Sequence, residues 1–188
     1  MKIRKNPFTA LFPCPVVLVT CVDSTGEPNI ITLAWAGTVC SEPPAVGLGI
    51  RPSRYSHTII KNSKEFVVNI PPARLVKETD YCGVTSGKDV DKFAETKLTP
   101  EQADEVEAPL IRECPVNMEC KLKDVIPLGA HDLFIGEVVQ VHIDPDILDE
   151  KGHIDFKKAD PFVYNVGEYW SIHKKIGTYG YSKQKSSQ

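Results

Sequence analysis

The sequence lacks several features that would assign a protein class at once. None of its apolar runs approaches the roughly 20 residues of a membrane-spanning helix. Its basic N-terminus is not followed by the apolar segment of a secretory signal, because Pro7, Pro13 and Pro15 interrupt it. It contains no G-x-G-x-x-G motif, which argues against a Rossmann domain. We therefore expect a cytoplasmic protein that lies in no membrane.

A strong charge of one sign is also missing. The 22 Lys and Arg residues nearly balance 25 Asp and Glu residues, for a net charge of −3. Such a chain shows no basic footprint for nucleic acid or anionic lipid. The six cysteines form no C-x-x-C pair, and the five histidines have no helical or zinc-finger spacing, so we expect no metal site. We interpret Cys14, Cys21 and Cys40, which lie in apolar runs, as small buried side chains.

The length of 188 residues suits one domain that spans 1–188, with a polar C-terminal tail at about 172–188. Short apolar runs between turn residues predict many strands. We expect strands at 15–22, 30–39, 45–50, 65–70, 116–125, 131–143 and 162–164, the first two as a hairpin and 131–143 with a bulge. Gly47 and Gly49 leave one face of 45–50 bare, so another backbone or a ligand comes close there.

Few helices separate these strands. Segment 56–63 predicts a short helix that Ser53 or Ser56 caps, and 73–82 predicts a second, with Pro72 in its first turn and Gly83 at its C-terminal cap. Segment 86–93 reads as a loop or short helix, and the acidic segment 99–107 as exposed. A parallel α/β sheet would need helices of about 10–15 residues between successive strands. The pattern favours a β-barrel with helical inserts.

The segment R-P-S-R-Y-S-H-T at 51–58 places cations and hydroxyls at a predicted helix start. Free backbone N–H groups and the helix dipole favour a phosphate dianion at such a place. The groups proposed to contact it are Arg51, Ser53, Ser56 and Thr58. The alternative is an ordinary solvated helix start with a serine cap. Arg54 and Tyr55 face either the same site or solvent.

An aromatic residue, Trp35, lies in the second predicted strand, before this segment in the chain. A phosphate site beside a flat aromatic side chain suggests a nucleotide-like cofactor. The alternative interpretation of Trp35 is a packing residue of the barrel core.

The order of the motifs resembles the flavin reductase-like proteins with the FMN-binding split barrel, most closely the flavoredoxin-like subgroup. The resemblance covers about residues 8–170 and is carried by P-V-V-L-V-T at 15–20, I-T-L-A-W at 31–35, S-E-P-P at 41–44, R-P-S-R-Y-S-H-T-I-I at 51–60, E-F-V-V-N-I-P at 65–71, S-G-K-D-V-D-K-F at 86–93 and G-A-H-D-L-F-I-G-E-V-V at 129–139. It implies a mainly β, Greek-key split β-barrel with a few helical inserts. It also implies a homodimer that holds FMN noncovalently near the subunit interface.

The resemblance adds residues to the candidate site. The segment implied to lie along the flavin ring is Thr32, Leu33, Ala34 and Trp35. Additional groups implied near the phosphate, the ribityl chain or a polar edge of the ring are Cys40, Ser41, Asn69, Ser86, Gly87 and Lys92. The alternatives are a surface lysine at position 92 and a turn residue at position 69.

His131 departs from the family pattern. Many flavin reductases carry G-D-H where this chain has Gly129-Ala130-His131, and the acidic neighbour follows as Asp132. We expect His131 to lie over a nicotinamide pocket or to balance charge on the reduced flavin. Direct hydride transfer requires no protein proton donor, so we assign it no acid–base role. The alternative is a strand-end histidine bonded to a neighbour.

Three functions are compatible with these expectations. The first is an enzyme that oxidises NADH or NADPH and reduces flavin or an onward acceptor. The second is a flavoredoxin-type carrier that holds FMN tightly and exchanges electrons with a redox protein, without a nicotinamide site. The third is an FMN-binding module without turnover.

Overall fold

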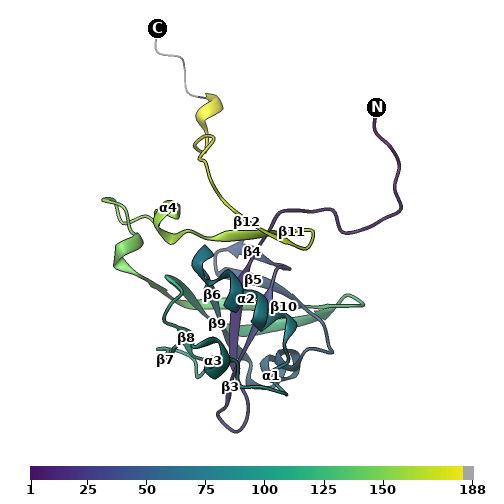
Figure 1. Cartoon of the computed structure of the whole chain (residues 1–188), viewed down its shortest axis with the longest axis vertical. Helices are drawn as coiled ribbons and strands as arrows, with labels where there is room; N and C mark the ends of the chain where they lie inside the picture. Colours follow the sequence, from purple (N-terminus) through teal and green to yellow (C-terminus); the bar gives the residue numbers. More distant parts are fainter. Residues whose placement is uncertain (184–188) are drawn as a thin grey trace.

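A seven-stranded antiparallel sheet forms the body of the protein in a computed structural model that describes residues 1–183 (Figure 1). The strands lie in the order β3-β2-β6-β9-β10-β5-β4. Their bounds are β2 Val17–Val22, β3 Pro28–Leu33, β4 Ala36–Ser41, β5 Pro44–Ile50, β6 Glu65–Ile70, β9 Val116–Pro127 and β10 Asp132–Ile143.

Two smaller sheets and four helices complete the fold. The strands of the small sheets are β1 Cys14–Pro15, β11 Phe162–Asn165 and β12 Glu168–Ser171 in one, and β7 Pro100–Glu101 and β8 Leu110–Ile111 in the other. The helices are α1 Tyr55–Ser63, α2 Val76–Val84, α3 Lys92–Thr96 and α4 Phe156–Ala159, with short 3-10 turns at Ala73–Leu75, Pro145–Ile147 and Tyr181–Lys183.

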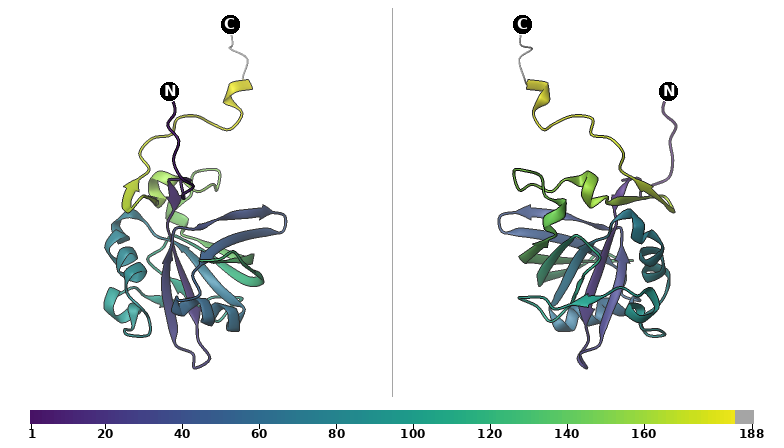
Figure 2. Two further views of the ribbon diagram at one scale, coloured as in Figure 1. Left: turned by 90° about the vertical axis from the view of Figure 1, so that its right-hand side faces the viewer. Right: turned by 60° about the vertical axis from the view of Figure 1, so that its left-hand side comes forward.

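The connection between β3 and β4 closes the sheet into a barrel. These two strands are its opposite edges, yet only Ala34 and Trp35 separate them along the chain. An extended chain covers no more than about 10 Å between Leu33 and Ala36, so the edges must come together. The Gly49 N–H donates to the Trp35 carbonyl at 2.7 Å and fastens the junction. Figure 2 shows the strands wrapped around a common interior, and the predicted split β-barrel is confirmed.

Both faces of strand β2, which lies next to the edge strand β3, are buried. Val17, Val19 and Cys21 point into the barrel interior with Ile59 and Ile60 of α1. The opposite face of β2 packs against the layer that contains α2 and α3 through Leu18, Leu75, Cys82 and Phe93. Helix α2 also approaches β3 closely, because a Cβ at Gly83 would lie 3.2 Å from Thr32 Cβ. The two layers place the N-terminus of α1 and the middle of α2 on either side of β3.

Several strand predictions are confirmed and one is wrong. Strands β2 and β3 form the predicted hairpin, and the bulge in β10 lies at Val139, where the register with β9 shifts between Val138 and Gln140. The single strand expected at 30–39 is two strands, because the chain leaves one edge of the sheet at Leu33 and enters the other at Ala36. Strand β12 was not anticipated.

The predicted helix caps are also corrected. The N-cap of α1 is Arg54, and no side chain caps the helix there. This leaves Ser53 and Ser56 available for other partners. Helix α2 runs through Gly83 to Val84, so Gly83 is not a C-terminal cap but the point of close approach to Thr32.

The buried-cysteine interpretation holds for Cys21 and fails for two others. Cys21 is buried, and desolvation raises the pKa of its thiol to about 12. Cys14 is half-buried, and Cys40 is exposed because β4 is an edge strand that only β5 flanks.

The two terminal segments extend away from the barrel at the same end of the molecule (Figure 1). The predicted tail begins directly after β12, and its residues 184–188 lie outside the described part of the chain. Among residues 1–183, no helix is both long enough and apolar enough to cross a membrane.

A buried carboxylate fixes segment 99–107 to the sheet. Glu119 of β9 is fully buried and accepts from the backbone N–H groups of Asp104, Glu105 and Val106. Its Oε1 also lies 2.6 Å from His142 Nε2.

Asp104, Glu119 and His142 offer ligand atoms within 4.8 Å of one another, but these bonds already occupy the Glu119 carboxylate. The absence of a metal remains a prediction. Segment 99–107 is exposed as expected, apart from residues such as Val106 that pack inward.

Glu119→Gln is expected to lower the free energy of unfolding at pH 7 by about 2–4 kcal/mol, because an amide cannot accept all of these bonds. Burial acts to raise the pKa of Glu119, but its hydrogen bonds, that with His142 foremost, bring it below the usual value. The carboxylate therefore stabilises the fold above its unfolded pKa, and this stabilisation is lost as pH falls through the folded pKa. Urea unfolding from pH 7 to 3 would show it. The exposed control Glu107→Gln should match the wild type; equal acid sensitivity in all three proteins would contradict the assignment.

Candidate functional site

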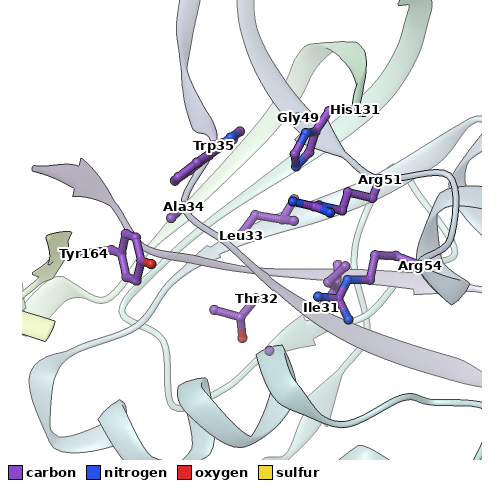
Figure 3. Close-up of a pocket in the computed structure, with 11 residues that line it drawn as sticks. Ile31, Thr32, Leu33, Ala34, Trp35, Gly49, Arg51, Arg54, His131 and Tyr164 are labelled. Carbon is purple, nitrogen blue, oxygen red and sulfur yellow. The ribbon is translucent and has the colours of Figure 1, made fainter. Parts of the chain in front are cut away.

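Two adjoining pockets lie where the barrel closes. The larger, about 220 Å³ and here called the aromatic pocket, is lined by Ile31, Thr32, Leu33, Ala34, Trp35, Gly49, Arg51, Arg54, Gly83, His131 and Tyr164 (Figure 3). The smaller, about 100 Å³ and here called the anion pocket, is lined by Asn29, Ile31, Ser53, Arg54, Tyr55, Ser56, Cys82, Gly83, Thr85, Ser86, Gly87 and Lys92. Ile31, Arg54 and Gly83 line both, so the two form one elongated site.

Strand β3 gives the aromatic pocket its backbone wall. As an edge strand β3 pairs only with β2, so the groups on its other side have no strand partner. Unpaired amide N–H and C=O groups of an edge strand suit a ligand with an amide-like edge. Thr32 uses its hydroxyl elsewhere, as a donor to the Thr79 carbonyl of α2.

Aromatic side chains from three segments meet in this pocket. Trp35 is 36% exposed, and its ring centroid lies 6.4 Å from that of His131 and 6.2 Å from that of Tyr164. Figure 3 shows Tyr164 on one side of the pocket, with Arg51 and Arg54 on the other. Flat surfaces beside cations form a site for a planar, polar ring system.

The anion pocket is built around a buried ammonium group. Lys92 is only 4% exposed, and its Nζ donates to the carbonyls of Ile30 at 2.7 Å and Cys82 at 2.8 Å. Within residues 1–183, no carboxylate lies within 4.0 Å of Nζ. An ammonium group has three donors, so one remains. Burial lowers the pKa of Lys92. A bound anion would supply the missing counter-charge.

Hydroxyl groups surround this ammonium. Ser56 is almost fully buried, and its Oγ accepts from Asn29 Nδ2 at 2.7 Å, so the hydroxyl group still has its proton to donate to a further partner. Ser53 and Ser86 line the same space. A Cβ at Gly87 would collide with the Asn29 amide, so the 86–87 backbone can approach this closely only without a side chain. These donors and the cation fit a phosphate group.

The charged residues that line the two pockets are all basic. Arg51, Arg54, Lys92 and His131 belong to the lining, and neither lining set contains Asp or Glu. Partial burial and the nearby Arg51 charge lower the pKa of His131, so the neutral imidazole is favoured at pH 7. Arg51 and Arg54, rather than His131, are therefore the permanent positive charges beside the aromatic pocket.

The structure brings most of the predicted site residues together. Those that line the aromatic pocket are Thr32, Leu33, Ala34, Trp35, Arg51 and His131. Those that line the anion pocket are Ser53, Ser56, Ser86, Gly87 and Lys92. Lys92 is buried, so the alternative of a surface lysine is wrong. Contact of these residues with a flavin stays a prediction.

Four predicted residues lie outside both pockets. Thr58 is exposed on α1 beside Asp23 and Asn62, because it follows Ser56 by two positions and a helix turns about 100° per residue. Cys40 and Ser41 are exposed at the end of β4. Asn69 is fully buried, where its amide bonds to Leu18 and other groups within the barrel wall.

Other lining residues were missed or left open. Arg54 lines both pockets, and its position between Arg51 and Ser56 was the available signal. Asn29 and Gly83 gave no local signal, since their roles depend on the packing of β3 against α1 and α2. Tyr164 comes from β11, far along the chain, and no motif connects it to the site.

Comparison with known proteins gives a consistent result. The family model described as "Flavin reductase like domain" matches residues 9–173. An uncharacterised protein of Archaeoglobus fulgidus is 33% identical over 81% of this chain and 85% of its own. The flavoredoxin of Desulfovibrio vulgaris (Miyazaki F) is 33% identical, with a TM-score of 0.92 over 98% of this chain and 100% of that one. Flavoredoxin from Methanosarcina acetivorans is 30% identical, with a TM-score of 0.90 over 98% of each chain.

Inorganic phosphate is expected to stabilise the wild-type protein through the anion pocket. At about 100 times its dissociation constant, a ligand adds about 2.7 kcal/mol, or roughly 5–10 °C in Tm for a chain of this size. Lys92→Met should abolish this phosphate-induced shift, whatever its own Tm. Thr58→Ala, outside the pocket, should respond like the wild type. Differential scanning fluorimetry measures the change in Tm. A phosphate-induced shift in Lys92→Met as large as that in the wild type would show that the Lys92 ammonium does not bind the phosphate.

Proposed function

This chain belongs to the flavin reductase-like family, and on that premise we propose that it is an FMN-binding oxidoreductase that accepts electrons from NADH or NADPH. The observation that carries the proposal is the buried Lys92, which has no carboxylate partner among residues 1–183 and lies beside a pocket for a planar ring. FMN combines a phosphate dianion and a planar, amide-edged tricycle in one molecule. Riboflavin would leave the ammonium without a counter-charge.

Each part of the site would bind a different part of FMN. Lys92, Ser53 and Ser56 hold the phosphate, and the free edge of β3 meets the polar edge of the ring. Bound FMN would supply the capacity to take up and release electrons. Arg51 and Arg54 place positive charge where a reduced, anionic ring is favoured over a neutral one.

A nicotinamide would bind without a domain of its own. It would have to lie against the exposed face of the ring, in the part of the aromatic pocket lined by Trp35, His131 and Tyr164. Flat side chains there favour an aromatic ring, and the neutral imidazole of His131 offers a hydrogen bond without a competing charge. Because this surface is small, modest affinity for NADH or NADPH is expected.

An electron carrier is the second candidate. The similarity to two flavoredoxins over nearly the whole chain favours it. In this alternative the protein keeps FMN bound and exchanges electrons with a redox protein, with no nicotinamide step. The site residues and the anion pocket are the same in both candidates, so only the electron donor differs.

Anaerobic mixing separates the two candidates. The purified protein loaded with FMN is expected to lose its yellow absorbance when NADH or NADPH is added. Protein-free FMN and the Lys92→Met variant should bleach much more slowly at the same flavin concentration. Reduction by a small iron–sulfur protein but by neither nicotinamide would support the carrier. Failure of the wild type to bind FMN would end both proposals.

We further propose a homodimer, supported by the distribution of charge. All 25 acidic residues lie between Asp23 and Glu168, whereas the segments outside this range carry seven Lys and Arg residues and no acid. The terminal segments leave the barrel at one end and expose apolar side chains such as Phe8 and Ile176 (Figure 1). The basic terminal segments of one copy would complement the acidic barrel of a second copy. In a two-fold arrangement each copy makes this contact with the other.

Removal of residues 1–12 is expected to weaken this dimer, and added salt should weaken it further because the charges are exposed. Sedimentation velocity at two ionic strengths measures both effects. A full-length protein that remains monomeric at micromolar concentration would contradict the dimer, and a truncated protein with unchanged self-association would remove the N-terminal segment from its interface.

A further inference from the structure

A largely buried His–Asp pair begins at the residue after Ser56, which lines the anion pocket. His57 Nε2 and Asp132 Oδ2 are 2.8 Å apart, with 8% and 13% of their side chains exposed. The imidazole packs edge-on against Phe134, with ring centroids 4.9 Å apart. Neither His57 nor Asp132 lines the aromatic or the anion pocket. A polar pair this well shielded is costly to bury unless its geometry is maintained.

Asp132 is connected to the segment 51–56 at both of its ends. Its backbone is opposite Ile50 in the β10–β5 ladder, immediately before the segment begins. Its carboxylate bonds to His57, immediately after the segment ends. One residue therefore closes the loop that contributes Arg51, Ser53, Arg54 and Ser56 to the two pockets.

The segment itself is held by few internal bonds. The Arg54 N–H donates to the Arg51 carbonyl and the His57 N–H to the Arg54 carbonyl, both at 3.0 Å. Among residues 1–183, no side chain caps α1, whose first turn begins at Tyr55 within this segment. The loop shape depends on how its ends are fixed, because an unrestrained loop regains conformational entropy.

We propose that Asp132, acting through His57, is a positioning residue that holds segment 51–56 in its anion-binding conformation. This inference rests on the proposed function for the identity of the ligand, FMN, but not for the loop closure itself. Asp132 itself lines neither the aromatic nor the anion pocket. Asp132 also directly follows His131, which lines the aromatic pocket. The same residue therefore links His131 to the segment that lines the anion pocket.

Loss of the carboxylate should act on the phosphate end of the ligand. Asp132→Ala is expected to weaken FMN binding by about tenfold, the effect of one lost charge-assisted hydrogen bond, and riboflavin binding much less. Asp132→Asn keeps an acceptor for His57 and should lie between the wild type and Asp132→Ala. His57→Phe retains the ring against Phe134 and should resemble Asp132→Ala. The double variant should be no weaker than either single variant, because both remove one contact.

A second readout needs no flavin. Hydrogen exchange of the Arg54 and His57 amides should accelerate in Asp132→Ala, since these two N–H groups form the bonds inside the loop. The matched control is an exposed His–Asp pair, in which His153 Nδ1 and Asp149 Oδ2 are 3.5 Å apart. Asp149→Ala should change neither the FMN-to-riboflavin preference nor exchange at Arg54 and His57.

The outcomes separate this inference from the proposed function. A wild type without preference for FMN over riboflavin would contradict the phosphate site, and the exchange measurement would still test the loop closure. Equal weakening of both flavins, or unchanged exchange at Arg54 and His57 in Asp132→Ala, would overturn the positioning role. If Asp132→Ala does not fold, the same comparison with Asp132→Asn and His57→Phe decides.

Discussion

The two-residue connection between β3 and β4 is the constraint on which the remaining structure depends. Ala34 and Trp35 join opposite edges of a seven-stranded sheet, so the sheet has to curl into a barrel. The same connection leaves β3 without a second strand partner and turns Trp35 toward its free edge. The barrel closure and the ligand pocket are therefore one feature, and a mutation that changes this junction would alter both.

The charges of the site differ in sign from those of the protein as a whole. The protein has more acidic than basic residues, yet the lining of both pockets contains only basic charged groups. Two carbonyl oxygens accept hydrogen bonds from the buried Lys92 ammonium but carry no net charge, so they leave its positive charge uncompensated. Burial of an unpaired cation is unfavourable, so an anion that binds here would offset the desolvation cost of burying Lys92. A pocket of this kind would favour a phosphorylated over an unphosphorylated ligand, as the proposed function requires.

Much of the barrel was predictable, because strand period and turn residues are local properties of the sequence. Strands β2, β5 and β6, the hairpin, the bulge in β10 and the helix α1 followed from such patterns. The expectation for 30–39 failed because an apolar run does not show where a chain changes from one sheet edge to the other. Cys40 was misjudged for the same reason, since exposure on an edge strand depends on its neighbours in space.

Local sequence patterns were enough to predict most of the strands and helices, the basic and hydroxyl-rich segment 51–58 and the resemblance to a family, because each of these depends on neighbouring residues. Tertiary structure decided which of those residues share a pocket: Ser56 and Arg54 do, whereas Thr58 and Asn69 do not. It also brought Tyr164, Asn29 and Gly83 to the site and placed Asp132 against His57. The physical reason is that side-chain direction and long-range contacts arise from barrel closure, which no local pattern records.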